Sequence, residues 1–135
     1  MPIVKVYGVP NSIDENVLEI FVAGVRNVLP LVTQLGITSE NVTVFLVPDM
    51  LQKGLGEEVC VEVVGLFDKP ERSDAVRQRV AIHLAYTVHT HLASHLPQLE
   101  LIEVLVPKFD QAESGFGRWH KADGFSREKD DGFPR

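Results

Sequence analysis

The sequence has almost none of the residues that would build a disulfide framework, because Cys60 is the only cysteine among 135 residues. An internal disulfide is therefore excluded, and a metal site would need ligands other than a set of thiolates. No run of about 18 uninterrupted apolar residues occurs, and the N-terminus lacks the basic and then apolar order of a signal peptide. These absences predict a soluble protein of the reducing cytoplasm.

Positive charge is also scarce. Thirteen Lys and Arg residues stand against 19 Asp and Glu residues, which gives a net charge of -6, and the basic residues form no dense stripe. This charge distribution argues against nucleic acid or an anionic membrane as the main partner. The hydrophobic fraction of 44% and the charged fraction of 24% are ordinary for a globular protein, and the length suits one domain.

Four short apolar segments predict strands. They are rich in β-branched residues and end at prolines or turn residues, which is typical of largely buried strands. The predicted strands lie within residues 1–9, 41–47, 58–67 and 99–106. The nearly all-apolar second segment favours a parallel strand beneath a helix.

Two segments between these strands have helical periodicity. Ser12 and Glu15 have the spacing of a capping box at the start of the first helix, and Pro30 predicts a kink or a local end of that helix. Ser73 or Asp74 is the predicted cap of the second helix. The apolar stripe of the first helix comprises Val17, Leu18, Phe21, Val25, Val28, Leu29 and Val32. The stripe of the second comprises Val76, Val80, Leu84, Val88 and Leu92.

The two halves of the chain are related by an internal repeat. An offset of 59 residues places Leu46-Val47-Pro48 on Leu105-Val106-Pro107. Two right-handed β-α-β units predict an α/β (α+β) fold, a four-stranded mixed sheet with both helices on one face. The other face is predicted to be apolar and uncovered, which favours a homo-oligomer that closes over it.

These patterns divide the chain into a domain and a tail. The domain is predicted at residues 1–110, with one repeat at 1–51 and the other at 57–110. Residues 111–135 are rich in Gly, Asp, Lys and Arg with scattered aromatics. We expect this polar tail to be partly mobile or to pack on a neighbouring subunit.

Pro2 is a candidate general base. Removal of the initiator Met1 would leave Pro2 as a secondary amine, held in place by the strand that follows. A free α-amino group has a pKa of about 8, and burial in an apolar pocket lowers that pKa toward neutrality, where a general base works best. The alternative is that Pro2 is only the start of a strand.

Four features resemble the tautomerase superfamily. They are Pro2 at the head of the first strand, the doubled β-α-β unit, the stretch Val47-Pro48-Asp49-Met50-Leu51, and Glu71-Arg72-Ser73-Asp74 at the start of the second helix. The superfamily includes 4-oxalocrotonate tautomerase, 5-carboxymethyl-2-hydroxymuconate isomerase, macrophage migration inhibitory factor and the 3-chloroacrylic acid dehalogenases. The resemblance covers about residues 2–119.

The resemblance implies a homotrimer in which an N-terminal proline moves a proton on a small keto or enol carboxylic acid without a cofactor. Pro2 takes the catalytic role, and Arg72 matches an arginine that binds a substrate carboxylate. Lys69 falls where a dehalogenase-like member has a second arginine. There are departures from the family pattern: Ile37 replaces the lysine that follows the first helix of the inhibitory factor, and Ser12 or its neighbours replace an arginine of the tautomerase.

Two alternatives to tautomerisation remain open. The chain can be a non-catalytic assembly or binding protein of the same fold. It can also be a hydratase or dehalogenase that acts on an unsaturated acid, with Asp110 or Glu113 activating water.

Two further groups of residues have competing interpretations. Arg118 and Trp119, near Phe116, either wall a substrate pocket over Pro2 or anchor the tail to a neighbour. His91 and His95 have the i, i+4 spacing of a metal site. We predict no metal there, because no third ligand is near in sequence and the helix dipole alone favours histidines at a C-terminus.

Overall fold

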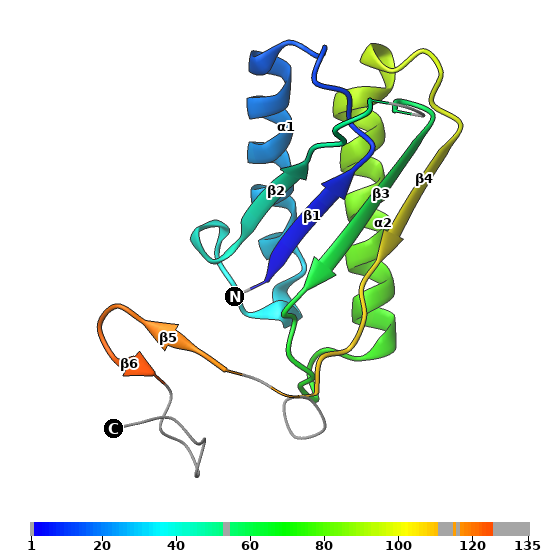
Figure 1. Cartoon of the computed structure of the whole chain (residues 1–135). Coiled ribbons are helices and arrows are strands. Elements are labelled where there is room, and N and C mark those ends of the chain that lie inside the picture. The colour runs from blue at the N-terminus through cyan, green and yellow to red at the C-terminus, as the bar shows by residue number, and fades with distance from the viewer. Residues whose placement is uncertain (1, 53–54, 111–114, 116, 126–135) are drawn as a thin grey trace.

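Two helices pack on one face of a four-stranded sheet (Figure 1). The computed structural model describes residues 2–52, 55–110, 115 and 117–125. The elements are β1 (Ile3–Tyr7), α1 (Glu15–Val28), β2 (Thr43–Val47), β3 (Glu58–Val64), α2 (Asp74–Leu92), β4 (Leu101–Leu105), β5 (Trp119–His120) and β6 (Gly124–Phe125). Short 3₁₀ turns span Leu29–Leu31, Thr33–Leu35, Ser39–Asn41 and Ala93–His95.

The sheet has the predicted mixed topology. Its strand order is β2-β1-β3-β4, in which β1 is parallel to β2, β3 is parallel to β4, and the central pair is antiparallel. Each parallel pair is the two-strand part of one β-α-β unit, so the doubled unit is confirmed. The antiparallel centre brings the start of β1 beside the end of β3, since Ile3 is paired with Val64.

The helix boundaries follow the predicted signals with one correction. The cap of α1 is Asp14, whose carboxylate accepts a hydrogen bond from the Asn16 backbone N–H at 2.8 Å. The predicted cap, Ser12, lies instead in the turn closed by the Ile13 N–H and the Pro10 carbonyl. Ser73 caps α2 as predicted, with its hydroxyl accepting from the Val76 N–H at 3.3 Å.

The core lies between the sheet and the helices. Alternate residues of the strands point into it, because side chains alternate across a sheet, and the apolar stripes of both helices cover them. All five predicted stripe residues of α2 are buried, as are Phe21, Val25, Leu29 and Val32 of the first stripe. The sheet contributes Val4, Val6, Val59, Val61 and Val63. Burial of these side chains from water is the main stabilisation of the fold.

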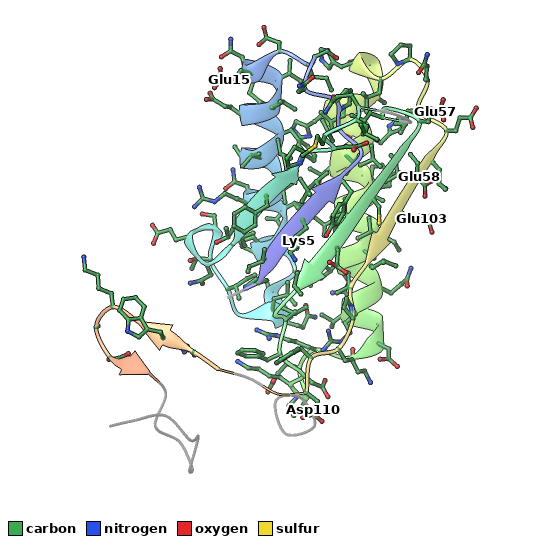
Figure 2. All side chains as sticks on the ribbon, viewed as in Figure 1. Lys5, Glu15, Glu57, Glu58, Glu103 and Asp110 are labelled. Atoms are coloured by element: carbon green, nitrogen blue, oxygen red, sulfur yellow. The ribbon has the colours of Figure 1, made fainter. Side chains whose placement is uncertain are left out.

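The face of the sheet away from the helices is uncovered, as predicted, but it is not simply apolar. Lys5, Glu58 and Glu103 alternate with the inward-facing residues of their strands, so their side chains project from this face (Figure 2). Glu62 alternates with Val61 and Val63 and lies on the same face. The apolar members of the same face are Ile3, Tyr7, Phe45, Val47, Val64, Leu101 and Leu105. Cys60 lies among these residues, and burial, followed by the charges of Glu103, Glu58 and Glu62, raises the pKa of its thiol. We call this surface the open face.

A membrane span is not found in the part of the chain that the structure describes: no helix there combines the length and the apolar character that crossing requires.

Candidate functional site

A cavity of about 230 Å³ lies at the end of the sheet where β1 begins and β3 ends. Its lining comes from three segments that the topology gathers there: the residue before β1, the connection from α1 to β2, and the connection from β3 to α2. Because β1 is parallel to β2 and antiparallel to β3, these segments meet at one end (Figure 1). The lining residues are Pro2, Gly36, Ile37, Asn41, Gly65, Phe67, Lys69 and Arg72.

Larger hollows occur elsewhere but lack this combination. One of about 380 Å³ runs along α1 between Glu15 and Arg26, and one of about 480 Å³ lies beside α2 around Ile82 and Tyr86. Neither has Pro2 among its lining residues. We therefore place the candidate site at the smaller cavity, which contains the candidate base and two cationic side chains.

Pro2 is buried, and its backbone is fixed at the cavity wall. Its carbonyl oxygen accepts a hydrogen bond from the Thr43 N–H at 3.2 Å. This bond continues the β1–β2 ladder by one position beyond the Ile3–Thr43 pair. The first strand therefore holds the proline in one place, as a positioned proton-transfer group requires.

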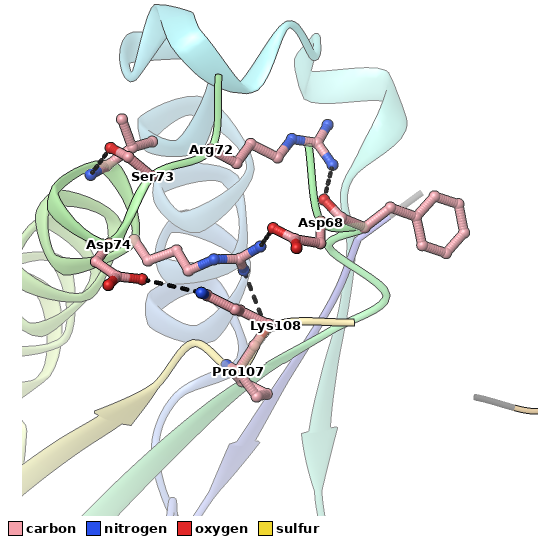
Figure 3. Close-up of polar contacts among 9 residues, drawn as sticks. Asp68, Arg72, Ser73, Asp74, Pro107 and Lys108 are labelled. Carbon is pink, nitrogen blue, oxygen red and sulfur yellow. Dashed lines mark hydrogen bonds and ion pairs between the residues drawn. The ribbon is translucent and has the colours of Figure 1, made fainter. Parts of the chain in front are cut away.

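Arg72 is held by backbone carbonyls. Arg72 is 6% exposed, and its Nη1 donates to the Phe67 carbonyl at 2.9 Å (Figure 3). Its Nη2 donates to the Leu35 carbonyl at 2.8 Å. Burial lowers the pKa of its guanidinium, the positive charge of Arg77 lowers it further, and Glu71 opposes both. The group still remains charged at neutral pH. Its Nε is buried and has no hydrogen-bond partner among the described residues.

Arg77 is also buried but has a carboxylate partner. It donates to the Pro107 carbonyl at 3.1 Å and forms an ion pair with Asp68 at 3.4 Å (Figure 3). It thus ties α2 to the end of β4 and to the connection after β3. Sequence reasoning missed this arginine, because nothing in its position on the helix distinguishes it from an exposed basic residue.

Asn41 was also missed as a cavity residue. Its carboxamide oxygen accepts from the Thr38 N–H at 2.8 Å and from the Thr38 hydroxyl at 3.2 Å. This is a capping interaction across the 3₁₀ turn Ser39–Asn41, and the pair Thr38-x-x-Asn41 was the available sequence signal. Gly36 adopts a left-handed φ of 64°, which lets the chain turn into this segment.

Of the remaining sequence candidates, one lines the cavity and the others that the structure describes do not. Lys69 is exposed and lines it, whereas Arg118 and Trp119 do not. Trp119 is 60% exposed in the β5–β6 hairpin, which stands apart from the sheet (Figure 1). Asp110 is not among the lining residues, and Glu113 lies outside the described residues.

The predicted histidine pair is divided between α2, which carries His91, and the turn after it, which carries His95. The Nδ1 atom of His91 lies 2.9 Å from the Thr87 carbonyl, and its ring lies against Phe21 with the ring centroids 6.2 Å apart. His95 is exposed in the turn after the helix. No cluster of three metal-ligating side chains occurs within the described ranges.

Comparisons with known proteins identify the fold. Neither the protein-family models nor the curated proteins contain a match to this sequence. Solved structures do match. A fused 4-OT, described as a wild-type asymmetric trimer, superposes with a TM-score of 0.61 at 16% identity and covers 84% of this chain and 91% of its own.

Two further structures extend this likeness. A malonate semialdehyde decarboxylase inhibited by 3-bromopropiolate has a TM-score of 0.56 at 13% identity, and the match covers 86% of this chain and 89% of the other. Macrophage migration inhibitory factor from Toxoplasma gondii has a TM-score of 0.56 at 12% identity, with 92% and 99% covered. All three proteins are members of the tautomerase superfamily, so the resemblance predicted from the sequence is confirmed at the level of the fold.

Proposed function

We propose that this chain is a cofactor-independent proton-transfer protein that interconverts the keto and enol forms of a small carboxylic acid, with Pro2 as the base. One observation carries the proposal: a single cavity is lined by Pro2, Lys69 and Arg72, and its described lining contains no carboxylate. A base beside two cations is the arrangement that an anionic acid substrate requires.

The proposed chemistry needs the Pro2 nitrogen to be a free amine. With Met1 removed, the neutral secondary amine takes the proton from the enol hydroxyl. The electrons of the C=C bond then form a new C–H bond with the proton that the amine returns, and the carbonyl forms. The positive charges of Lys69 and Arg72 disfavour a protonated amine, which favours the base form at neutral pH.

Arg72 and Lys69 are proposed to hold the substrate carboxylate. Each terminal guanidinium nitrogen of Arg72 carries two N–H groups, and only one hydrogen bond per nitrogen goes to a backbone carbonyl. The remaining donors and the ammonium of Lys69 are available to an anion. Since the cavity holds about 230 Å³, the proposed substrates are small.

We propose that the chain works as a homotrimer in the cytoplasm, without nucleic acid or membrane as partner. The open face supports self-association, since it leaves Phe45 at 51% and Leu105 at 52% exposed in the isolated chain. The fused 4-OT with the same fold is described as a trimer. Arg118 and Trp119 would then act only on the cavity of a neighbouring subunit.

A second candidate function is binding without catalysis. It is favoured by the two hydrogen bonds from Arg72 to the Phe67 and Leu35 carbonyls, which are those of a structural arginine. In this alternative Pro2 only begins a strand, and the cavity binds a small anion without changing it. Hydration or dehalogenation has less support, because Asp110 does not line the cavity.

The test is the intact mass of untagged protein, followed by ketonisation assays with phenylpyruvate and 2-hydroxymuconate. We expect Met1 to be absent and Pro2→Ala to lower kcat/KM by about 100- to 10,000-fold, the usual contribution of a general base. Pro48→Ala is the matched control, because Pro48 is exposed and outside the cavity. Retained Met1, or a Pro2→Ala variant as active as the parent, would contradict proton transfer and leave binding as the function.

A further inference from the structure

The orientation of the Asn41 carboxamide is fixed by its partners. A backbone N–H can only donate, so the atom 2.8 Å from the Thr38 nitrogen must be the carboxamide oxygen. The Thr38 hydroxyl donates to the same oxygen at 3.2 Å. Both acceptor sites of that oxygen are therefore used, and the Nδ2 amide group is the end left to make other contacts.

The turn that carries Asn41 is held at several points. The Asn41 N–H donates to the Thr38 carbonyl at 3.0 Å and the Val42 N–H to the Ser39 carbonyl at 3.2 Å. The Arg26 guanidinium Nε also donates to the Ser39 carbonyl, at 3.3 Å. Such a group needs little reorganisation on binding.

The Nδ2 group has no acceptor within the part of the chain that the structure describes, although Asn41 lines the cavity. Strand order fixes its place: Asn41 precedes β2, Pro2 precedes β1, and the Lys69–Arg72 segment follows β3. Along this end of the sheet, Pro2 therefore lies between Asn41 on one side and the Lys69–Arg72 segment on the other. Adjacent strands lie about 4.8 Å apart, so a small substrate spans this row.

We propose that the Nδ2 amide of Asn41 donates a hydrogen bond to the oxygen on carbon 2 of the substrate while its carboxylate faces Arg72 and Lys69. This inference rests on the proposed function and adds a specificity determinant to it: the site selects 2-oxo or 2-hydroxy acids over acids without an oxygen at that carbon. A neutral amide stabilises the negative charge that develops on this oxygen during proton transfer and does not itself give up a proton.

The test compares two ligands that differ only at carbon 2. Phenylpyruvate at tautomeric equilibrium has the oxygen, and 3-phenylpropionate has the same ring and carboxylate without it. We expect wild type to bind phenylpyruvate more tightly, and Asn41→Ala to reduce that preference about tenfold, the worth of one hydrogen bond. The affinity for 3-phenylpropionate should stay within twofold, which a general loss of structure would not allow.

Asn41→Asp guards against misfolding, because a carboxylate still accepts from Thr38. It replaces the donor by a negative charge, so both the preference and kcat/KM for ketonisation should fall further than in Asn41→Ala. Asn11→Asp is the matched control, since Asn11 is exposed in the turn after β1 at the other end of the sheet. It adds the same charge and should leave both ligand affinities unchanged.

The outcomes separate this inference from the proposed function. If wild type ketonises phenylpyruvate but both Asn41 variants keep the wild-type preference, the role of Asn41 is overturned and proton transfer stands. If wild type shows no turnover but its preference for phenylpyruvate disappears in the variants, the role of Asn41 in recognition is supported and proton transfer fails. A wild type without any preference overturns the inference directly.

Discussion

The two ends of the sheet are built from equivalent positions of the two repeats, yet they carry opposite chemistry. The Pro2 carbonyl accepts from the Thr43 N–H at 3.2 Å, and the Glu57 carbonyl accepts from the Leu101 N–H at the same distance. Pro2 before β1 and Glu57 before β3 thus occupy the same position in the ladder. The candidate base stands where β1 begins. The Glu57 carboxylate stands at the other end of the sheet (Figure 2).

The helix starts repeat this contrast. The residue before the Asp14 cap of α1 is Ile13, which packs against the core, and the residue before the Ser73 cap of α2 is the buried Arg72. We call the end with Pro2 and Arg72 the basic end and the end with Glu57 and Ile13 the acidic end. The comparison teaches that the doubled unit supplies the scaffold twice, and that the proposed anion site at the basic end depends on two positions, those of Pro2 and Arg72.

The first prediction concerns the glycines that follow the central strands. Gly8 after β1 has a φ of 93°, and Gly65 after β3 has a φ of 77°. A Cβ at Gly8 would collide with the Glu58 carbonyl oxygen, which is backbone and cannot move away. We expect Gly8→Ala to lower the free energy of unfolding by about 2–4 kcal/mol and Gly65→Ala to lower it by less, with about 1–2 kcal/mol of the Gly65 loss coming from positive φ.

Denaturant unfolding of both variants checks this order. A Gly65→Ala variant that loses more stability than Gly8→Ala would break the comparison, because the basic end would then be the more constrained one. Gly36→Ala is a useful reference, since Gly36 has a φ of 64° and open space around its Cβ position. It should lose only the cost of positive φ.

The second prediction replaces Arg72 at the basic end by isoleucine, the residue at the equivalent position of the acidic end (Ile13). Arg72→Ile removes the guanidinium hydrogen bonds to the Leu35 and Phe67 carbonyls, which should cost about 1–3 kcal/mol of unfolding free energy. It should also weaken the binding of malonate, a small anionic probe, by about 10- to 100-fold, the worth of charged hydrogen bonds.

Thermal unfolding with and without malonate measures both effects, because a ligand that binds the folded state raises its stability. Arg79→Ala is the control, since Arg79 is exposed and donates a hydrogen bond to the Gln34 carboxamide on the surface. An Arg72→Ile variant that keeps the full malonate response would show that the guanidinium is structural, and the two ends would then differ only in Pro2.

The sequence predicted the strands, helices and topology because each rests on local periodicity: alternating valines in β1 and β3 and the stripe of α2 are visible without any long-range contact. It also placed Pro2, Lys69 and Arg72 together as candidates, and they share one cavity. That much follows from a strand start and a helix start meeting at the same end of a sheet.

Long-range contacts were beyond sequence reasoning. The hydrogen bond from Arg72 to Leu35 joins segments from different repeats, and no local pattern encodes it. Ser12 and Asp14 are both suitable capping residues, and the local sequence does not choose between them. The turn after Pro10 contains Ser12, so the helix begins later and Asp14 is its cap. The charges of the open face were overlooked because the apolar content of the strands hid their alternation.

The third prediction concerns the open face toward the acidic end. Glu58 on β3 and Glu103 on β4 are diagonal neighbours there, because Glu58 is paired with Leu101 and Cys60 with Glu103. A hydrogen bond to Glu103 raises the pKa of Glu58, and burial and the Glu103 charge raise it further. The folded chain therefore holds this proton more firmly than the unfolded chain, whose reference pKa is 4.5.

This difference in proton affinity between the folded and unfolded chains decides whether stability rises or falls with pH. The stabilisation from the shared proton is complete below the unfolded pKa and is lost as the pH rises through the raised pKa of Glu58. Glu103→Gln supplies an uncharged donor to the Glu58 carboxylate, so the fall in stability over this pH range should flatten. Unfolding across that range measures the effect, with the exposed Glu100→Gln as control. Parallel pH profiles for wild type and Glu103→Gln would refute the shared proton.

The smallest effect is expected from the β5–β6 hairpin. Trp119 is 60% exposed and does not line the cavity of its own chain, so Trp119→Ala should change the free energy of unfolding by less than about 0.5 kcal/mol. Denaturant unfolding of dilute protein checks this, with Arg118→Ala as a neighbouring exposed control. A loss above about 1 kcal/mol would mean that the tryptophan is buried on the domain or on a second copy. In that case the tail would help to stabilise the basic end. The two ends would then differ in this stabilisation as well as in Pro2 and Arg72.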